Sequence, residues 1–288
     1  MSRGVNLGHA DQYGVREGVI TSTSNQAVKR IRALGARKER ERAGLTWAEG
    51  IRLALAALDA RAGVETLVVA PELLTSETAL ERVAAAERSG VPVLRVSAGV
   101  FQSLSRKDGP QGLGAVLRPR WIQLSDVVVG ERGRWLALVE PQDPGNVGTI
   151  LRTAGAAGVD GVILVGPSAD PYDPEALRAS TGAAFTVPLA RCSWDELAGW
   201  ARRAGVALVG AAGRAGDDYR SVRYPGRLVL IMGSEREGLS AAQCNACELL
   251  VSIPMAGKVD SLNLAVATGV LLYEIHAQLR TPSNKMPK

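Results

Sequence analysis

The sequence has little of what marks a secreted, disulfide-stabilised or membrane-spanning protein. It contains only three cysteines in 288 residues, so a disulfide framework is not expected. Its longest purely apolar runs, such as residues 53–58 and 228–232, are far shorter than the roughly 20 residues that cross a bilayer. Residues 1–13 lack the apolar core of a signal peptide. These features predict a cytoplasmic protein with no membrane span.

The small numbers of histidines and cysteines, and the spacing of the glycines, also disfavour several kinds of catalytic site. With only two histidines, a histidine-supported serine or cysteine nucleophile is not expected. The pair Cys244 and Cys247 has the spacing of a redox motif or half a zinc site, but too few further soft ligands are present, and no metal is expected. The glycine-rich segment 210–216 lacks the spacing of a dinucleotide fingerprint.

What the sequence has instead is a basic N-terminal part. Residues 1–120 carry 18 Lys and Arg against 12 Asp and Glu, whereas residues 121–288 carry 16 against 17. Within residues 29–42, basic side chains combine with an apolar stripe at helical spacing, which predicts one amphipathic helix with a cationic outer face. A solvated helix surface and a surface that binds nucleic-acid phosphates are both compatible with this pattern. The candidate RNA-binding residues are Lys29, Arg30, Arg32, Arg37, Lys38 and Arg40.

Helical and strand patterns alternate along the whole chain. Residues 1–120 predict a compact α/β domain with strands at 66–70, 91–96 and 113–117 and further helices at 51–58 and 78–88. Residues 121–134 mix Pro, Arg, Gly and Glu and are expected to form a linker.

The alternation restarts in a second expected domain, residues 135–288. Its predicted strands are 135–139, 161–165, 206–209, 228–232 and 249–253, and its predicted helices are 147–157, 174–183, 194–204 and 263–279. Apolar strands joined by crossover helices predict a parallel sheet, with ligand chemistry at the carboxyl ends of the strands.

The first candidate cluster follows the strand at 135–139. Asn146 lies at the amino end of the next helix, and Arg152 lies on that helix's polar face, so both are expected to point toward the same loop region. A helix N-terminus with these side chains suits a phosphate or a developing oxyanion. A capping asparagine and a surface ion pair are the structural alternatives.

Two further clusters follow the strands at 228–232 and 249–253. In the first, Gly233 and Gly238 permit tight turns on either side of Glu235, and Ser240 is expected to cap a short helix. The second leads into a helix that is apolar on nearly every side and must therefore be enclosed by protein or by a partner chain. The expected caps of that helix are Ser261 or Asp260, and an amide at its mouth, Asn263, is expected to have a specific partner.

Together the three clusters resemble the motifs of the SpoU/TrmH family of RNA ribose 2′-O-methyltransferases. The matching residues are Asn146, Gly148, Arg152 and Gly158, then Met232, Gly233, Glu235, Gly238 and Leu239, and last Ile253, Pro254, Met255, Gly257, Ser261, Leu262 and Asn263. This resemblance covers residues 135–280. Residues 20–117 resemble, more loosely, the family's L30e-like RNA-binding domain, through Glu49-Gly50 and Gln111-Gly112. In that domain a strand usually precedes Glu-Gly, and here residues 45–48 are only a weak strand candidate. The family fold implies a parallel-sheet SPOUT domain whose C-terminal segment forms a trefoil knot.

The resemblance also implies a cofactor and a reaction. S-adenosylmethionine would be held mainly by backbone around Ala211, Gly233, Ile253, Met255 and Leu262. The expected catalytic residues are Arg152, acting as a base or as a cation beside the forming oxyanion, and Asn146, Glu235, Ser261 and Asn263, which would orient it and the ribose. A homodimer is implied, with Arg152 acting on cofactor bound by the partner.

The separate N-terminal domain favours ribosomal RNA over transfer RNA as the substrate, and an enzyme that confers antibiotic resistance is one alternative within the family. A non-catalytic RNA-binding protein of the same fold is the alternative from another class. A small-molecule enzyme of the doubly wound class is disfavoured by the basic N-terminal part.

Overall fold

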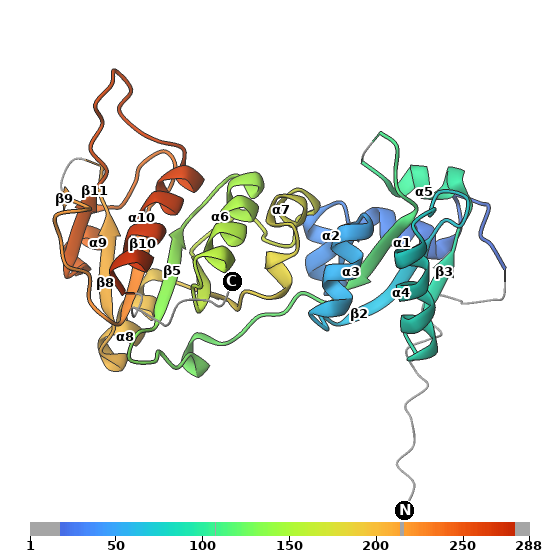
Figure 1. Ribbon diagram of the computed structural model, residues 1–288, viewed down its shortest axis with the longest axis horizontal. Helices are drawn as coiled ribbons and strands as arrows, with labels where there is room; N and C mark the ends of the chain where they lie inside the picture. Colours follow the sequence, from blue (N-terminus) through green and yellow to red (C-terminus); the bar gives the residue numbers. More distant parts are fainter. Residues whose placement is uncertain (1–17, 107, 214–215, 280–288) are drawn as a thin grey trace, which may run out of the picture. The chain divides into compact units, whose positions relative to one another are not determined.

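The computed structural model describes residues 18–106, 108–213 and 216–279, and its elements are labelled in Figure 1. The chain forms two compact units. The first consists of Met1–Pro119 together with Tyr172–Phe185, and the second of Arg120–Pro171 together with Thr186–Lys288. The expected 135–288 domain is therefore interrupted, because a segment in its middle belongs to the N-terminal unit.

The N-terminal unit is built on a mixed four-stranded sheet in the order β1-β4-β2-β3. The strands are β1 (Thr46–Glu49), β2 (Val64–Val69), β3 (Val93–Arg95) and β4 (Leu113–Leu117). The weak strand candidate at 45–48 does form a strand, antiparallel to β4. The indole of Trp47, in this strand, packs closely over Gly114. A Cβ on Gly114 would lie 2.1 Å from the ring. A glycine on the neighbouring strand, two residues from the Val116 that pairs with Trp47, thus leaves room for the indole and compensates for the strand's poor apolar pattern.

The helices of this unit are α1 (Gln26–Ala33), α2 (Arg37–Ala43), α3 (Ile51–Asp59), α4 (Glu77–Arg88), α5 (Ala98–Leu104) and α7 (Pro174–Ser180). Side chains of α1 and α5, including Val28, Ile31 and Phe101, form one buried cluster with Trp47 and Val68 of the sheet. The helix α7, which was expected as a crossover helix of the second domain, contacts β1 instead.

The single basic helix predicted over 29–42 is wrong, because the chain breaks between α1 and α2. The carbonyl groups of Leu34 and Gly35 accept hydrogen bonds from the Arg40 guanidinium at 3.1 and 3.2 Å, and Arg106 also donates to Gly35 at 2.9 Å. A helix ends with carbonyl groups that lack intrahelical partners. Two arginines satisfy them here, one of them distant in sequence.

The C-terminal unit contains a seven-stranded sheet in the order β7-β6-β5-β10-β8-β11-β9, in which every neighbouring pair is parallel. Its strands are β5 (Arg134–Val139), β6 (Gly161–Val165), β7 (Leu189–Cys192), β8 (Ala207–Ala211), β9 (Asp217–Asp218), β10 (Leu228–Met232) and β11 (Leu249–Ser252). The predicted parallel α/β architecture is confirmed. The edge strands β7 and β9 were not predicted.

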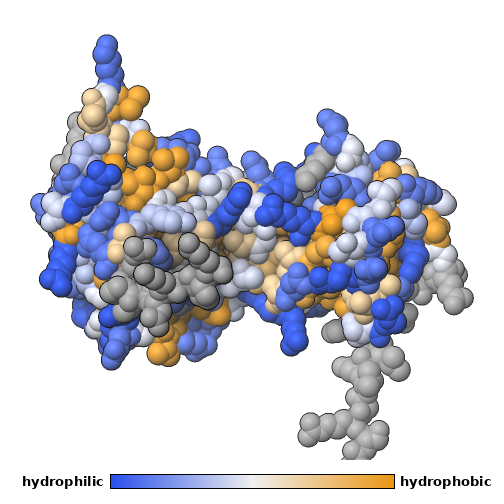
Figure 2. All heavy atoms as spheres, viewed as in Figure 1, coloured by the Kyte–Doolittle hydropathy of each residue, from blue (hydrophilic) through white to orange (hydrophobic). Residues whose placement is uncertain are grey.

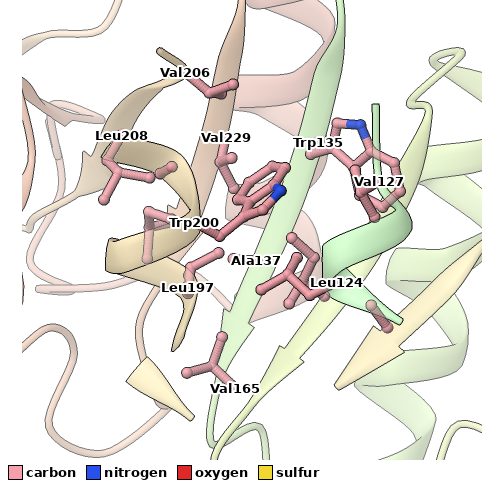
Figure 3. Close-up of a cluster of buried hydrophobic side chains, with 14 of the residues drawn as sticks. Leu124, Val127, Trp135, Ala137, Val165, Leu197, Trp200, Val206, Leu208 and Val229 are labelled. Carbon is pink, nitrogen blue, oxygen red and sulfur yellow. The ribbon is translucent and has the colours of Figure 1, made fainter. Parts of the chain in front are cut away.

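Helices cover both faces of this sheet. On one face α6 (Pro144–Ala156) and α10 (Leu264–Leu279) lie side by side (Figure 1). On the other face, α8 (Trp194–Ala204) inserts Trp200 and Leu197 among alternate strand residues, as Figure 3 shows. The same core contains Leu124, Val127 and Val129, so the predicted linker 121–134 is wrong: part of it packs in the core of the C-terminal unit.

The remaining α-helix of this unit is the short α9 (Ala241–Ala246), which precedes β11. The end of α10 is fastened to the loop between β9 and β10, since the Gln278 side chain accepts from the Tyr224 nitrogen at 3.3 Å and donates to the Val222 carbonyl at 3.2 Å. The trefoil knot implied by the family resemblance stays a prediction. Within the described ranges, the helices are all too short or too polar to cross a bilayer.

Candidate active site

The clearest site in the C-terminal unit is a cavity of about 720 Å³ at the carboxyl ends of β8, β10 and β11. These three strands are neighbours in the sheet, so the loops that follow them converge. All five residues predicted to hold the cofactor line this cavity, namely Ala211, Gly233, Ile253, Met255 and Leu262. The structure thus brings together segments that are separated by up to fifty residues in the sequence.

The loop after β10 depends on glycine at two positions. Ser234 and Gly238 form a narrow backbone bridge, with hydrogen bonds of 3.3 and 3.0 Å between their main-chain groups. A Cβ on Gly233 would lie 2.2 Å from the Gly238 carbonyl carbon, which no real side chain tolerates. Gly238 itself has a φ of +66°, in the left-handed region that favours glycine. The loop can therefore fold only with both glycines, as the sequence indicated.

A chain of directed hydrogen bonds joins the three clusters. The backbone nitrogens of Ala265 and Val266 donate to Asn263 Oδ1 at 2.8 and 3.3 Å, which leaves its Nδ2 to donate to Asn146 Oδ1 at 3.0 Å. Asn146 Nδ2 then donates to Glu235 Oε1 at 3.3 Å. Because backbone N–H groups can only donate, they fix the orientation of both amides. The chain of donors ends on the Glu235 carboxylate.

The helix caps differ from those expected. Asp143 caps α6, accepting from the Asn146 nitrogen at 2.9 Å, and Asn263 caps α10 in place of Ser261 or Asp260. Because Asp143 takes the capping role, the Asn146 side chain is available to the other two clusters. The specific partner expected for Asn263 is Asn146. Ser240 caps α9 as predicted, within a capping box.

Four of the five predicted catalytic residues are brought together. Glu235, Ser261 and Asn263 line the cavity, and Asn146 is connected to it through its hydrogen bonds. Arg152 is different: it lies exposed on α6 and does not line the cavity, and its side chain forms no ion pair or hydrogen bond with the described residues. The expectation that it points toward the same loop region as Asn146 stays a prediction.

One residue at the site escaped the sequence analysis. The Gln142 backbone nitrogen donates to Glu235 Oε2 at 3.2 Å, so both oxygens of that carboxylate accept a hydrogen bond. The Gln142 side chain donates to the carbonyl groups of Glu140 at 2.7 Å and Pro167 at 3.4 Å. Glu140 has a φ of +47°, a strained conformation for a non-glycine residue. The only sequence signal was the position of these residues directly after a strand.

The candidate RNA-binding residues divide into two groups. Lys29, Arg30, Arg32, Arg37 and Lys38 are exposed on α1 and α2. Arg40 is buried, and its guanidinium forms an ion pair of 2.9 Å with Asp173 in addition to its bonds to the helix end. The assignment of Arg40 to RNA binding is therefore wrong, because its charge is used inside the N-terminal unit.

The cysteines have the properties of packed thiols. Burial raises the pKa of Cys192 and of Cys247 to about 11, so both are protonated at neutral pH and poor nucleophiles. Among the described residues, there is no group of three or more His, Cys, Asp or Glu side chains that could hold a metal ion.

Comparison with known proteins agrees with this geometry. The family model described as SpoU rRNA Methylase family matches residues 133–273, and an MRM3-like substrate binding domain matches residues 25–115. An AdoMet-bound rRNA methyltransferase from Sinorhizobium meliloti has a crystal structure that matches with a TM-score of 0.84 and 39% identity, over 92% of this chain and 99% of that one.

Two curated relatives extend over nearly the whole chain. A 23S rRNA uridine 2′-O-methyltransferase of Streptomyces viridochromogenes is 33% identical, over 88% of this chain and 90% of its own length. A 23S rRNA guanosine 2′-O-methyltransferase of Bacillus subtilis is 29% identical, over 89% of this chain and 98% of its own length. With its motif residues gathered at one end of a parallel sheet, the chain belongs to the SpoU rRNA methylase family.

Proposed function

We propose that the protein transfers a methyl group from S-adenosylmethionine to a ribose 2′-hydroxyl of RNA. The substrate that we propose is 23S ribosomal RNA. The observation that carries this proposal is the hydrogen-bonded chain Asn263–Asn146–Glu235 at the rim of the cavity. The chain holds three polar side chains from separate segments in one fixed orientation beside a cavity, and convergent polar groups of this kind are typical of a binding or catalytic site. The named activities of the relatives support the same reaction class.

The cavity fits the proposed cofactor. Its volume of about 720 Å³ lies within the range of small-molecule sites. Apolar side chains such as Met255 and Leu262 line it together with the polar ends of the three strands, and Glu235 adds a negative charge on one side. These groups suit a ligand with an adenosine body, a polar amino-acid end and a cationic sulfur. When bound, S-adenosylmethionine supplies an electrophilic methyl group.

The remaining chemistry is left to side chains of the protein. A ribose hydroxyl must lose its proton as its oxygen attacks the methyl carbon, and stabilisation of the developing oxyanion favours that loss. Arg152 is the proposed source of this stabilisation, because a guanidinium stays charged and can also hold an adjacent phosphate. Asn146, Glu235, Ser261 and Asn263 form the surface against which the ribose would be oriented.

A homodimer would complete the site. Val266 and Tyr273 on α10 are 53% and 52% exposed, and hydrophobic residues gather beside the upper end of α10 on the face drawn in Figure 2. A symmetric dimer is the commonest way to bury such a surface. Pairing through α6 and α10 would bring the exposed Arg152 of one subunit toward the cavity of the other.

The test is methyl transfer from labelled S-adenosylmethionine to ribosomal and transfer RNA, with the modified nucleotide identified by mass spectrometry. Label on a ribose of 23S ribosomal RNA is the expected result. Label on a base, or none on any RNA, would overturn the proposal. Cofactor binding, measured by calorimetry without RNA, distinguishes an enzyme from a non-catalytic protein of the same fold. This substrate would place the protein in the cytoplasm, and protection from an antibiotic stays a prediction.

A further inference from the structure

The N-terminal unit contains a second cavity, of about 370 Å³, between α1 and α2. Its apolar surface comes from Ile31, Leu34 and Leu45, three side chains that are almost wholly buried. Ala33 and Ala43 also line it and have the smallest side chains on its wall. The break between the two helices thus opens a hollow where a single continuous helix would have had none.

Charged groups surround this hollow. Arg30, Arg42 and Glu39 line it, and the Arg42 guanidinium is held by Glu39 through hydrogen bonds of 3.0 and 2.6 Å from its Nε and Nη2. Lys29 and Lys38 are exposed on the same two helices. The other acidic side chain of α2, Glu41, forms an ion pair with Arg37. The surroundings are therefore cationic, with one carboxylate at the cavity itself.

We infer that this cavity binds one unpaired nucleobase of an RNA substrate, while the surrounding cations contact its phosphates. Single-stranded RNA is recognised by bases that leave the stack and lie against apolar side chains or guanidinium planes. The hollow offers an aliphatic floor, two arginines and a carboxylate that can accept from a base amino or imino group. A fully apolar ligand would make no use of the arginines at the rim, and a purely anionic one would make no use of the apolar floor.

This inference rests on the proposed function, since it names the part of the RNA that the N-terminal unit recognises. It differs from binding through surface charge alone in one measurable respect. Loss of a base pocket lowers affinity for single strands by the stacking contribution and leaves the salt dependence unchanged. Loss of a phosphate contact lowers the salt dependence as well.

The experiment uses the full-length protein and a 12-nucleotide single-stranded RNA that contains one 2-aminopurine. Ala33→Leu with Ala43→Leu fills the cavity with aliphatic groups without changing charge, and Ala85→Leu, on the exposed side of α4, is the matched control. We expect the filled variant to bind about tenfold more weakly, with an unchanged salt slope and a reduced change in 2-aminopurine fluorescence. Circular dichroism checks that the variant is folded.

Three outcomes would overturn the inference: affinity equal to that of the Ala85→Leu control, an equal loss for a fully paired duplex, or competition by an acidic peptide at concentrations where free nucleotides do not compete. Methyl transfer is measured in parallel. Normal transfer by the filled variant, with an unchanged KM for RNA, contradicts the pocket but keeps the proposed function. Absence of transfer by the wild-type protein contradicts the function, while the oligonucleotide result still decides the pocket.

Discussion

The Nδ2 atom of Asn263 donates a 3.0 Å hydrogen bond to Oδ1 of Asn146, although the two residues lie 117 positions apart. One amide caps α10 and the other sits in the first turn of α6. The bond therefore fixes the relative position of two helix N-termini, and both helix dipoles favour negative charge there. The Glu235 carboxylate lies there and accepts from Asn146. A phosphate or an oxyanion of the substrate would meet the same field.

Substitutions of Asn263 can distinguish its role as the cap of α10 from its hydrogen bond to Asn146. Asn263→Asp keeps an acceptor for the Ala265 nitrogen but places a carboxylate oxygen against Asn146 Oδ1, so the donor is lost. We expect a melting temperature within a few degrees of wild type and at least a tenfold loss of methyl transfer. Asn263→Ala should also lose about 1 kcal/mol of stability through the missing cap. Wild-type turnover by Asn263→Asp, in initial-rate measurements, would contradict a catalytic role for the hydrogen bonds that join Asn263, Asn146 and Glu235.

The Gly233 position allows a sharp test of the cofactor loop. Gly233→Ala forces a Cβ to within 2.2 Å of the Gly238 backbone, so the loop must open. We expect S-adenosylmethionine binding, measured by calorimetry, to weaken by more than tenfold. Gly257→Ala is the matched control, because no atom lies within 4 Å of a Cβ built there. Equal affinities for the two variants would show that this loop does not hold the cofactor.

The ion pair of Arg40 with Asp173 should be important for the stability of the N-terminal unit. Asp173→Asn keeps its capping bond to the Glu175 nitrogen but removes the carboxylate charge that pairs with Arg40, whose side chain is only 2% exposed. Removing one member of a buried pair costs about 3–5 kcal/mol, and somewhat less is expected here because Asp173 is partly exposed. Hydrogen exchange in β1 and β4 measures the effect.

The control for that experiment is Arg37→Ala, which breaks the exposed pair with Glu41. Such surface pairs contribute less than about 1 kcal/mol. Exchange rates in β1 and β4 that are equal for Arg37→Ala and Asp173→Asn would contradict the assigned importance of the buried pair.

The proposed dimer predicts complementation between two inactive variants. Arg152→Ala should lose methyl transfer with cofactor affinity within a few fold of wild type, and Arg152→Lys should not restore it, because one ammonium cannot replace a planar fork. Mixed with Gly233→Ala under subunit exchange, Arg152→Ala should regain part of the activity, since some heterodimer sites are intact. Sedimentation as a monomer would remove the premise, and a dimer without complementation would place each site within one chain.

The buried thiols predict a pH dependence. Because burial raises the pKa of Cys192 and Cys247 from 9.0 to about 11, native alkylation by iodoacetamide should keep rising by about tenfold per pH unit to near pH 11. The urea-unfolded protein should level off near pH 9. The folded state holds these protons more tightly, so the stability they contribute below pH 9 is lost as the pH rises from 9 to 11. A native plateau near pH 9 would contradict this.

Much of the site could be predicted because the carboxyl ends of parallel strands share one edge of the sheet. Gly233, Ile253 and Leu262 were expected together for that reason and by family resemblance, and the cavity brings them together. Strand order was beyond reach, since β10 enters between β5 and β8, two strands formed earlier in the chain. Nothing local in the sequence specifies that insertion.

The errors came from contacts between distant residues. The helix over 29–42 ends early because Arg106, far along the chain, helps satisfy the carbonyl of Gly35. Arginine is usually a surface residue, but Arg40 is buried, where it pairs with Asp173 from a distant part of the sequence. Asn263 rather than Ser261 caps α10, and its amide also donates to Asn146, 117 positions earlier in the sequence. Each of these three features depends on tertiary contacts, which the periodicity of the sequence does not predict.

The insertion of Tyr172–Phe185 into the N-terminal unit has a consequence for protein synthesis. The unit's first 119 residues leave the ribosome without the Asp173 carboxylate that Arg40 requires. At about 5–20 residues per second, roughly 3–13 s pass before residue 185 is made. Throughout that interval the Arg40 guanidinium lacks its bond to Asp173, so its burial, and with it the complete folding of the unit, is delayed. The N-terminal unit is thus first in the sequence but cannot finish folding first.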